Sequence, residues 1–187
     1  MGAPHPTHSL HAPTNQNLSL SNHGRNQLIR REGLIRHYYN DSANNCTYGV
    51  GTLAHLGPCT CQELHTNVTH DLLVGSLQHG IRIAESAVRR NVTRQHLTQY
   101  QFDELVSFTY NVGAGGAHNV LHLVNAGQLS HAAHTMTRYT HATVYGANGQ
   151  PQRDGSGHIV TRVLPGLIRR RAEESAPFRI HQRGGRQ

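Results

Sequence analysis

Three polar residues near the N-terminus have types and a spacing that suit cleavage of a glycosidic bond. Glu32 closes an apolar run, Asp41 lies in the turn NDSANN, and Thr47 opens the β-prone run that follows. Hydrolysis of a sugar linkage needs one carboxylic acid that protonates the leaving oxygen and a second carboxylate on the opposite side of the sugar. The spacing E-x8-D-x5-T also arises by chance, so the alternative is two surface carboxylates and an ordinary strand threonine.

The expected surroundings of the two carboxyl groups differ in a way that would separate the acid and base roles. The C-terminal end of a helix is negative, which disfavours the ionised form of a carboxyl group such as that of Glu32. Asp41 lies among Asn and Ser residues that favour its ionised form. The hydroxyl of Thr47 can donate to Asp41 and accept from a water molecule. We therefore predict that Glu32 is the general acid and that Asp41 and Thr47 hold the attacking water.

The apolar pattern along the chain predicts mostly helices and one β-hairpin, which carries Asp41 and Thr47. The first helix is expected after a cap at Ser21 or Asn22, with helical spacing as far as Ile35 and Gly33 near its end. Residues 56–69 read as loop, and residues 144–163 as an irregular hairpin or excursion. Further helices are expected from residue 71 after a cap at Thr69, then near 100–112, 117–126 and 128–139, and after Pro165. This is an α+β protein.

The 187 residues suit one domain that is large enough to bury a core, and they contain no long apolar run of membrane-spanning length. Residues 1–20 are rich in His, Pro, Thr and Asn, so a flexible tail is expected there. The domain is expected over 21–180, with a small β-lobe at about 37–68 and a helical lobe formed by 21–36 and 70–178. A second flexible tail is expected at 181–187.

The net charge is +7, and all 17 basic residues are arginines. A basic surface favours polyanions such as nucleic acid, an anionic membrane or a bacterial wall. Arg169 and Arg170 precede Glu173 and Glu174 by four residues, so this run is expected to form a solvated helix face with ion pairs. Because no aromatic residues are interleaved with the arginines, nucleic-acid binding is not favoured.

The other candidate sites give weaker signals. Cys46, Cys59 and Cys61 are too few for a disulfide framework, and their C-x-C spacing matches neither zinc knuckles nor redox sites. His118 and His122 lie one helical turn apart, but the glutamate of H-E-x-x-H is absent. We therefore expect structural or incidental cysteines, no metal and no cofactor.

Three blocks of sequence resemble the phage-type lysozymes of glycoside hydrolase family 24. The first is EGLIRHYYNDSANNCTYGVG at residues 32–51, which carries the pattern E-x8-D-x5-T followed by glycines. The second is QFDELVSFTYNVGAGG at 101–116, which is similar to the central buried helix of that family and its glycine turn. The third, LPGLIRRRAEE at 164–174, is similar to the C-terminal helix. Order and spacing agree over about residues 24–178.

The resemblance implies a two-lobed lysozyme-like fold, with a small β-lobe joined to a helical lobe by a long helix. It implies hydrolysis of the β-1,4 bond between N-acetylmuramic acid and N-acetylglucosamine in peptidoglycan, with inversion and without a cofactor or metal. The general acid of the family falls on Glu32, and the pair that positions water falls on Asp41 and Thr47. Thr52 stands where the family commonly has His or Trp, so no sugar-binding residue is assigned.

The biological setting is open to several readings. An endolysin, a tail-associated lysozyme and a secreted antibacterial effector would share this chemistry. The N-terminus lacks the apolar segment of a signal peptide, which favours an endolysin held in the host cytoplasm until a holin releases it to peptidoglycan in the periplasm. An effector would instead need an immunity protein. A monomer without stable membrane insertion is expected, and the rival classes are a non-catalytic wall-binding protein of the same fold and a nucleic-acid binder.

Overall fold

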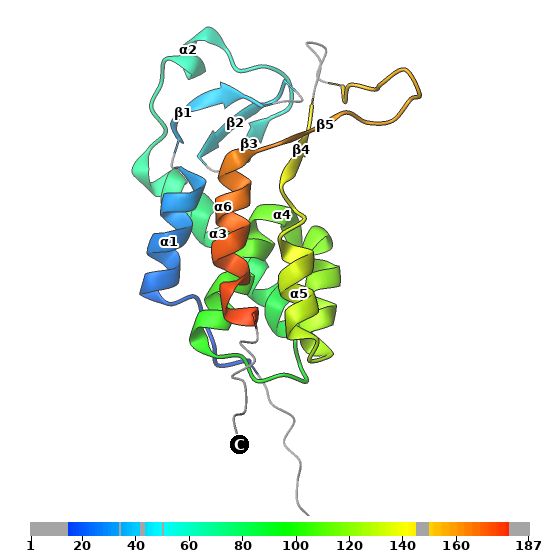
Figure 1. The fold of residues 1–187 in the computed structure, drawn as a ribbon. Helices are drawn as coiled ribbons and strands as arrows, with labels where there is room; N and C mark the ends of the chain where they lie inside the picture. The colour runs from blue at the N-terminus through cyan, green and yellow to red at the C-terminus, as the bar shows by residue number, and fades with distance from the viewer. Residues whose placement is uncertain (1–14, 34, 42–43, 50, 145–149, 180–187) are drawn as a thin grey trace, which may run out of the picture.

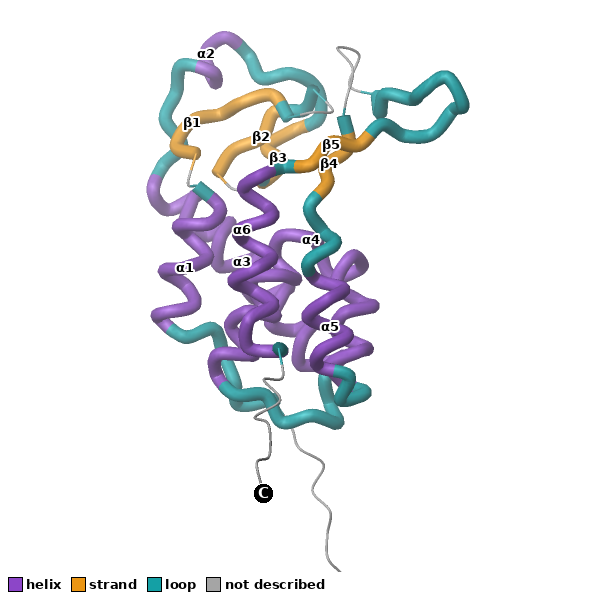
Figure 2. Tube along the Cα trace, viewed as in Figure 1, coloured by secondary structure: helices purple, strands orange, loops and turns teal. Residues whose placement is uncertain are grey.

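The computed structural model describes residues 15–33, 35–41, 44–49, 51–144 and 150–179. Its larger helices stand together beneath a small three-stranded sheet, and a two-stranded sheet lies beside the upper end of the bundle (Figures 1 and 2). The helices are α1 (Asn22–Glu32), α2 (Cys61–Leu64), α3 (His70–Asn91), α4 (Gln99–Asn125), α5 (Leu129–Met136) and α6 (Pro165–Ser175). The strands are β1 (Ile35–Asn40), β2 (Cys46–Gly49), β3 (Thr52–His55), β4 (His141–Thr143) and β5 (Thr161–Val163). The predicted α+β class is confirmed.

The β-lobe contains the predicted hairpin and one further strand. β1, β2 and β3 form an antiparallel sheet in that order, so β2 has a partner on each side. Thr47 of β2 pairs with Tyr39 of β1 and with Leu53 of β3. Its neighbour Cys46 stands opposite His55, and the register of the β2–β3 pair shifts between Cys46 and Thr47. Strands β1 and β3 therefore hold the backbone of Thr47 from both sides.

The core lies between the helices of the lower lobe. α3 and α4 pack along one another, and the apolar residues that recur every three or four positions in α3 are buried. α3 begins after Thr69, the predicted cap. Leu28 of α1 and Phe178 of the short 3-10 helix Ala176–Phe178 close the core from other sides. Residues 102–109 of α4 are buried on every side, as the apolar pattern of this helix predicts.

The glycine-rich part of α4 contains the predicted break, although it is shorter than expected. A break at the three glycines and a new helix from residue 117 were predicted. Within α4 only Gly113 leaves helical geometry, with φ 77° and ψ 160°, so two helical parts meet at a kink there and the second continues to Asn125. A positive φ strains any residue with a Cβ, so this one glycine provides the kink.

The predicted flexible tail of residues 1–20 extends too far. Asn15 is buried, and its side-chain amide donates to the carbonyl oxygens of Val92 (2.8 Å) and Gln95 (3.0 Å) and accepts from the backbone N–H of Leu97 (3.1 Å). Leu20 is buried in the core. Residues 15–20 therefore lie against the segment that connects α3 to α4. Long-range hydrogen bonds satisfy the buried polar groups of Asn15 and so hold a segment of polar composition in place. Residues 1–14 and the predicted tail at 181–187 lie outside the described residues.

Two further predicted segments acquire regular structure. The loop expected at 56–69 contains α2, whose first turn is closed by a capping box between Thr60 and Glu63. The irregular hairpin or excursion expected at 144–163 follows β4 directly and ends in β5, and these two strands pair in antiparallel register, as in a hairpin. Residues 145–149 of that excursion lie outside the described residues.

Two glycines offer a matched test of how tightly α1 is packed. A Cβ at Gly24 would lie 2.7 Å from Cγ of Asp103 and 2.8 Å from Cδ1 of Leu20, whereas one at Gly75 in α3 would meet nothing within 4 Å. We expect Gly24→Ala to lower the free energy of unfolding by about 1–3 kcal/mol through overpacking. Gly75→Ala should raise it by about 0.5–1 kcal/mol. Urea denaturation of both variants measures this, and shifts of the same sign would contradict the packing.

Candidate active site

Glu32 is the last residue of α1, which ends earlier than predicted. The helix begins at the predicted cap Ser21, whose side chain accepts from the N–H of Gly24. Gly33 then adopts φ 62° and ends the helix, so that Ile35 already begins β1. A left-handed backbone of this kind is accessible to glycine with little strain. The carboxyl group of Glu32 is thereby placed where the helical lobe passes into the sheet.

The side chain of Glu32 is held by an ion pair that the sequence did not indicate. Nη2 of Arg170 in α6 donates to Oε1 of Glu32 over 2.6 Å, and only 13% of the Glu32 side chain is exposed. The same guanidinium donates through Nε to Glu174 (2.8 Å) and through Nη2 to the carbonyl oxygen of Ser107 (3.1 Å). The described residues give Oε2 of Glu32 no hydrogen-bond partner, so that oxygen is the one available to a substrate.

The prediction of a solvated arginine face on α6 is correct for Arg169, which is exposed, and wrong for the two arginines that follow. Arg170 and Arg171 are both buried, and both pair with the fully buried Glu174. Arg171 also donates to Asn111 and lies over the ring of Phe108, with its Cζ 4.9 Å from the centroid. The expected four-residue pairing of Arg170 with Glu174 does form, but inside the protein, because this side of α6 faces α4 rather than solvent.

A second arginine joins α1 to the same network. Arg31 donates to Glu104 (2.7 Å) and to the hydroxyl of Ser107 (3.0 Å), both from the buried half of α4. Burial raises the pKa of Glu104, and the hydrogen bond and charge of Arg31 offset part of that effect. Polar residues inside an otherwise apolar helix require partners. That rule, applied to DELVS in α4, is the sequence signal that predicts such a network.

Asp41 and Thr47 come together as the hairpin predicts. The hydroxyl of Thr47 lies 3.3 Å from Oδ2 of Asp41 and 3.2 Å from the carbonyl oxygen of Asn45, so its single proton can reach either acceptor. Oδ1 of Asp41 accepts from the backbone N–H of Asn45 (2.9 Å). Asn44 occupies the left-handed region with φ 60°, which Asn tolerates in turns. The aspartate is therefore oriented by the turn in which it lies.

Two pockets bear on the site: one is lined by Glu32, and the other is lined by Tyr110. Glu32 lines a pocket of about 670 Å³ together with the ends of α1 and α6 and Asn111 of α4. A second pocket, of about 340 Å³, lies between Thr52 of the sheet and the facing sides of α3 and α4, where Tyr110 and Gly113 line it. Asp41 and Thr47 are not among the described residues that line either pocket. The structure thus joins Asp41 to Thr47, and it places Glu32 in a separate contact at the junction of the lobes.

Tyr110 links the second pocket electrostatically to Glu32. Burial and the negative charge of Glu32 raise the pKa of the Tyr110 phenol to about 12, and the charge of Arg170 acts in the opposite direction. The neutral phenol is therefore the form present in this pocket at any ordinary pH. It can donate a hydrogen bond to a polar ligand there.

This pKa predicts a specific titration behaviour. Because the folded-state pKa lies above the ordinary value near 10, the contribution of Tyr110 to stability is complete below about pH 10 and is lost as pH rises toward 12. In rapid-mixing pH jumps, wild type and Tyr110→Phe should give equal phenolate absorbance up to about pH 11 and diverge only above it. A difference already present at about pH 10 would contradict the burial of this phenol.

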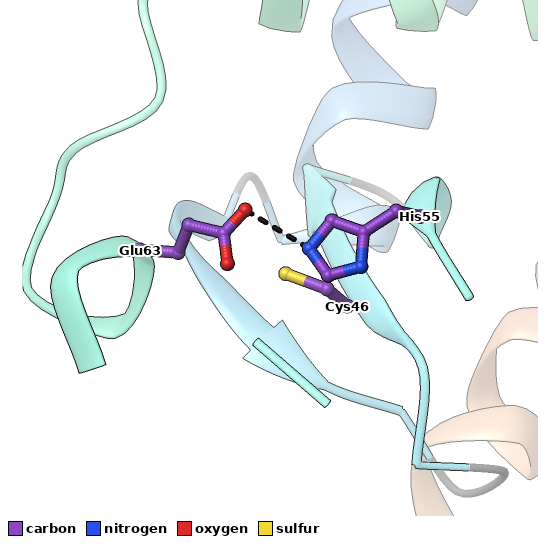
Figure 3. Close-up of side chains that lie close together, drawn as sticks. All are labelled: Cys46, His55 and Glu63. Carbon is purple, nitrogen blue, oxygen red and sulfur yellow. Dashed lines mark hydrogen bonds and ion pairs between the residues drawn. The ribbon is translucent and has the colours of Figure 1, made fainter. Parts of the chain in front are cut away.

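The cysteines were expected to be structural or incidental, and the histidine pair on α4 was not expected to bind a metal. Cys46 and Cys59 form a disulfide in the β-lobe, and Cys61 is a free, exposed thiol. His118 and His122 lie exposed on α4. In the described part of the chain, the side chains of Cys46, His55 and Glu63 bring metal-ligand atoms close together (Figure 3). The sulfur of Cys46 is bonded to Cys59 in the disulfide.

Comparison with known proteins decides the family. The sequence matches the phage lysozyme family over residues 29–174, which is most of the chain and includes Glu32, Asp41 and Thr47. This chain belongs to the phage lysozyme family. The three-block resemblance noted in the sequence is confirmed at that level.

Individual relatives agree with the family assignment. The SAR-endolysin of Haemophilus phage HP1 is 28% identical over 166 residues, covering 88% of this chain and 83% of the relative. An endolysin of Bacillus phage B103 is 27% identical over 165 residues, and the match spans about half of its length, 54%. No described helix of this family member combines the length and the apolar composition needed to cross a bilayer.

Solved structures share the fold. The muramidase domain of SpmX from Asticaccaulis excentricus is 31% identical with a TM-score of 0.64, covering 86% of this chain and 97% of that domain. The endolysin from Escherichia coli O157:H7 phage FAHEc1 is 26% identical with a TM-score of 0.65, covering 87% and 94%. The predicted lysozyme-like architecture is confirmed by these neighbours.

Proposed function

We propose that this phage lysozyme is an inverting muramidase of glycoside hydrolase family 24. Membership of the family, together with relatives named endolysin and muramidase, supports a lysozyme-type glycoside hydrolase that acts on peptidoglycan. The bond cleaved is the β-1,4 linkage between N-acetylmuramic acid and N-acetylglucosamine. The observation that carries the proposal is the contact between Thr47 and Asp41 on the hairpin that directly follows the helix ending at Glu32.

In the proposed mechanism, Glu32 gives its proton to the oxygen that leaves the sugar. A water between Asp41 and Thr47 attacks the anomeric carbon from the opposite side and transfers a proton to Asp41. Arg170 fixes one oxygen of Glu32, which leaves the other oxygen to face the substrate. For inversion the two carboxyl groups flank the sugar at a separation of roughly 6.5–9.5 Å, which leaves room for the water.

Analysis of the products tests the reaction. Purified sacculi are digested with the full-length protein, and the soluble muropeptides are identified by mass spectrometry. Reducing muramic-acid ends support the muramidase. Anhydro ends would indicate a lytic transglycosylase, cut peptides would indicate another enzyme class, and no released muropeptide would favour a wall-binding protein of the same fold.

A substitution at Thr47 tests the water-positioning role. Thr47→Val keeps the branched shape in β2 but removes the hydroxyl that lies 3.3 Å from Asp41. We expect kcat to fall by about 10²-fold, because a misplaced nucleophile is costly even where the carboxylate remains. Thr161→Val, at an exposed strand position in β5, is the matched control and should keep wild-type activity. Equal activity of Thr47→Val and wild type would refute this role.

The biological role that we propose is that of an endolysin. Synthesis in the host cytoplasm and action in the periplasm agree with the relatives named endolysin. Release through a holin and a monomeric state are part of this proposal. A tail lysozyme, or a secreted effector with an immunity protein, would use the same site. Lysis timing in cells that express the gene with and without a holin distinguishes the first role from the others.

A further inference from the structure

A group of metal-ligand atoms meets in the β-lobe, and the proposed hydrolysis does not use it. Sγ of Cys46, a ring nitrogen of His55 and a carboxylate oxygen of Glu63 all lie within 4.8 Å of one another (Figure 3). Cys59 is bonded to Cys46, so its sulfur lies at the same place. We propose that reduction of the Cys46–Cys59 disulfide opens a site for a thiophilic divalent cation of the zinc class, with Cys46, Cys59, His55 and Glu63 as ligands.

The backbone brings these four residues together by independent routes. Cys46 in β2 stands directly opposite His55 in β3, and side chains of directly paired residues lie on the same face of a sheet. Glu63 is supplied by α2. Cys59 lies in the connection between β3 and α2, where its backbone N–H donates to the side chain of Asn40 (2.7 Å). The arrangement therefore does not depend on the disulfide alone.

The histidine is oriented for metal binding by a backbone carbonyl. Nδ1 of His55 lies 3.1 Å from the carbonyl oxygen of Leu56, which can only accept, so Nδ1 carries the hydrogen. In the neutral ring this leaves the lone pair on Nε2, which lies 3.0 Å from Oε1 of Glu63. In the protonated ring a proton lies between these two atoms, and a cation bound to both would take its place. Such a second contact on a ligating histidine is the usual way in which its tautomer is set.

The glutamate is anchored in the same manner. Its second oxygen, Oε2, accepts from the backbone N–H of Thr60 (2.7 Å) and from the Thr60 hydroxyl (2.8 Å). Oε1 is therefore the oxygen turned toward His55. Each of these two polar ligands thus has one atom held by the protein and another directed into the cluster.

The donor set suits zinc, and the dimensions require small movements. Two thiolates, one imidazole and one carboxylate are donors that Zn²⁺ accepts in tetrahedral sites, and thiolates disfavour Mg²⁺ and Ca²⁺. Ligand atoms at about 2.0–2.3 Å from one tetrahedral ion are roughly 3.3–3.8 Å apart. Nε2 of His55 and Oε1 of Glu63 are already 3.0 Å apart, the longer separations in the cluster shorten from at most 4.8 Å, and the two sulfurs, once reduced, move apart from their bonded distance. Cys46 and Cys59 are buried, whereas the side chains of His55 and Glu63 are 42% and 28% exposed, so an ion can enter from the solvent side.

The chemistry balances with an external thiol as reductant. Two thiol molecules, for example glutathione, are oxidised to one disulfide, and their two electrons and two protons convert the Cys46–Cys59 bond into two thiols. Binding of the divalent cation then releases one proton from each thiol and, when the imidazole of His55 is protonated, the proton on its Nε2 as well. In a reducing compartment the metal thus replaces the disulfide as the cross-link beside Thr47. In an oxidising compartment the disulfide excludes the metal.

Cobalt(II) is a suitable probe because thiolate coordination gives it charge-transfer and visible ligand-field absorption. The full-length protein is reduced with a phosphine under argon and titrated with Co²⁺, followed by Zn²⁺ competition. We expect one thiolate-coordinated Co²⁺ per chain, displaced by Zn²⁺, and no such absorption from the oxidised protein. Absence of a thiolate band in the reduced wild type, or a Co²⁺ complex with nitrogen and oxygen ligands alone, would overturn the proposal.

Variants assign the ligands. His55→Ala should weaken Co²⁺ binding at least tenfold, and Cys46→Ser with Cys59→Ser should abolish the thiolate band. His65→Ala, at an exposed histidine beside α2, and Cys61→Ser should both bind as wild type does. Circular dichroism confirms that each variant is folded, and His55→Ala tests the ligand set even if the double cysteine variant does not fold. Unchanged affinity in His55→Ala, or loss of binding in Cys61→Ser, would refute the ligand set.

Discussion

Glu32→Gln should abolish most of the lytic activity of this protein while leaving the fold intact. The amide keeps the shape of the side chain, and its oxygen can still accept from Arg170, which lies 2.6 Å from Oε1 of the native glutamate. The amide has no acidic proton, so the leaving sugar oxygen departs unprotonated. Loss of a positioned general acid costs about 10²–10⁴ in kcat, equivalent to roughly 2.7–5.5 kcal/mol of barrier.

The measurement is the rate at which the full-length protein clears outer-membrane-permeabilised cells, supported by single-turnover release of muropeptides. Asp71→Asn is the matched control because Asp71 is a fully exposed carboxylate in the first turn of α3. That control should clear cells at the wild-type rate. A Glu32→Gln variant that clears cells as fast as the control would remove Glu32 from the mechanism and leave the family's chemistry without its acid in this chain.

Glu174→Gln should produce a larger loss of stability than any other single substitution proposed for this protein. Glu174 is fully buried and accepts from Arg170 (2.8 Å), from the hydroxyl of Ser107 (2.7 Å) and from Arg171. Removing its charge leaves two buried guanidinium groups with only part of their compensation. Breaking a buried pair in this way costs about 3–5 kcal/mol of unfolding free energy. In a chain of this length that lowers the melting temperature by roughly 6–20 °C.

The neighbouring residue gives a control of the same chemical type. Glu173 is 48% exposed and pairs with Arg31 at 3.2 Å, so Glu173→Gln should cost no more than about 1 kcal/mol, as is typical of exposed ion pairs. Differential scanning calorimetry of both variants at one salt concentration measures the difference. Equal shifts would show that the buried network contributes nothing beyond surface electrostatics. Because Arg170 also holds Glu32, we expect Glu174→Gln to lose activity as well as stability.

Short-range features of this fold were predictable from the sequence because they depend on neighbouring residues. Ser21 and Thr69 cap the helices that they were predicted to cap, since the preference of a hydroxyl for a free backbone N–H acts over three residues. The hairpin that joins Asp41 to Thr47 was predicted for the same reason, because these residues are six positions apart across one turn. The order of the three blocks was sufficient to indicate the family.

One predicted segment was wrong because a local signal competed with a tertiary contact. The polar composition of residues 15–20 predicted a tail, but hydrogen bonds that join Asn15 to residues some eighty positions away order this segment. Partners distant in the sequence here outweigh local preference. The glycines of α4 did predict a break, which the structure places at Gly113 alone.

The sequence by itself determined the order of the helices, the hairpin and the positions of the three candidate catalytic residues. The tertiary structure alone decided which charged side chains form ion pairs, which cysteines are bonded and which arginines are buried. Arg170 reaches Glu32 across 138 positions, Cys46 pairs with Cys59 rather than with Cys61, and two arginines expected in solvent are buried. The physical reason is that helix and turn preferences act over a few residues, whereas the partner of a buried charge is set by how α1, α4 and α6 pack.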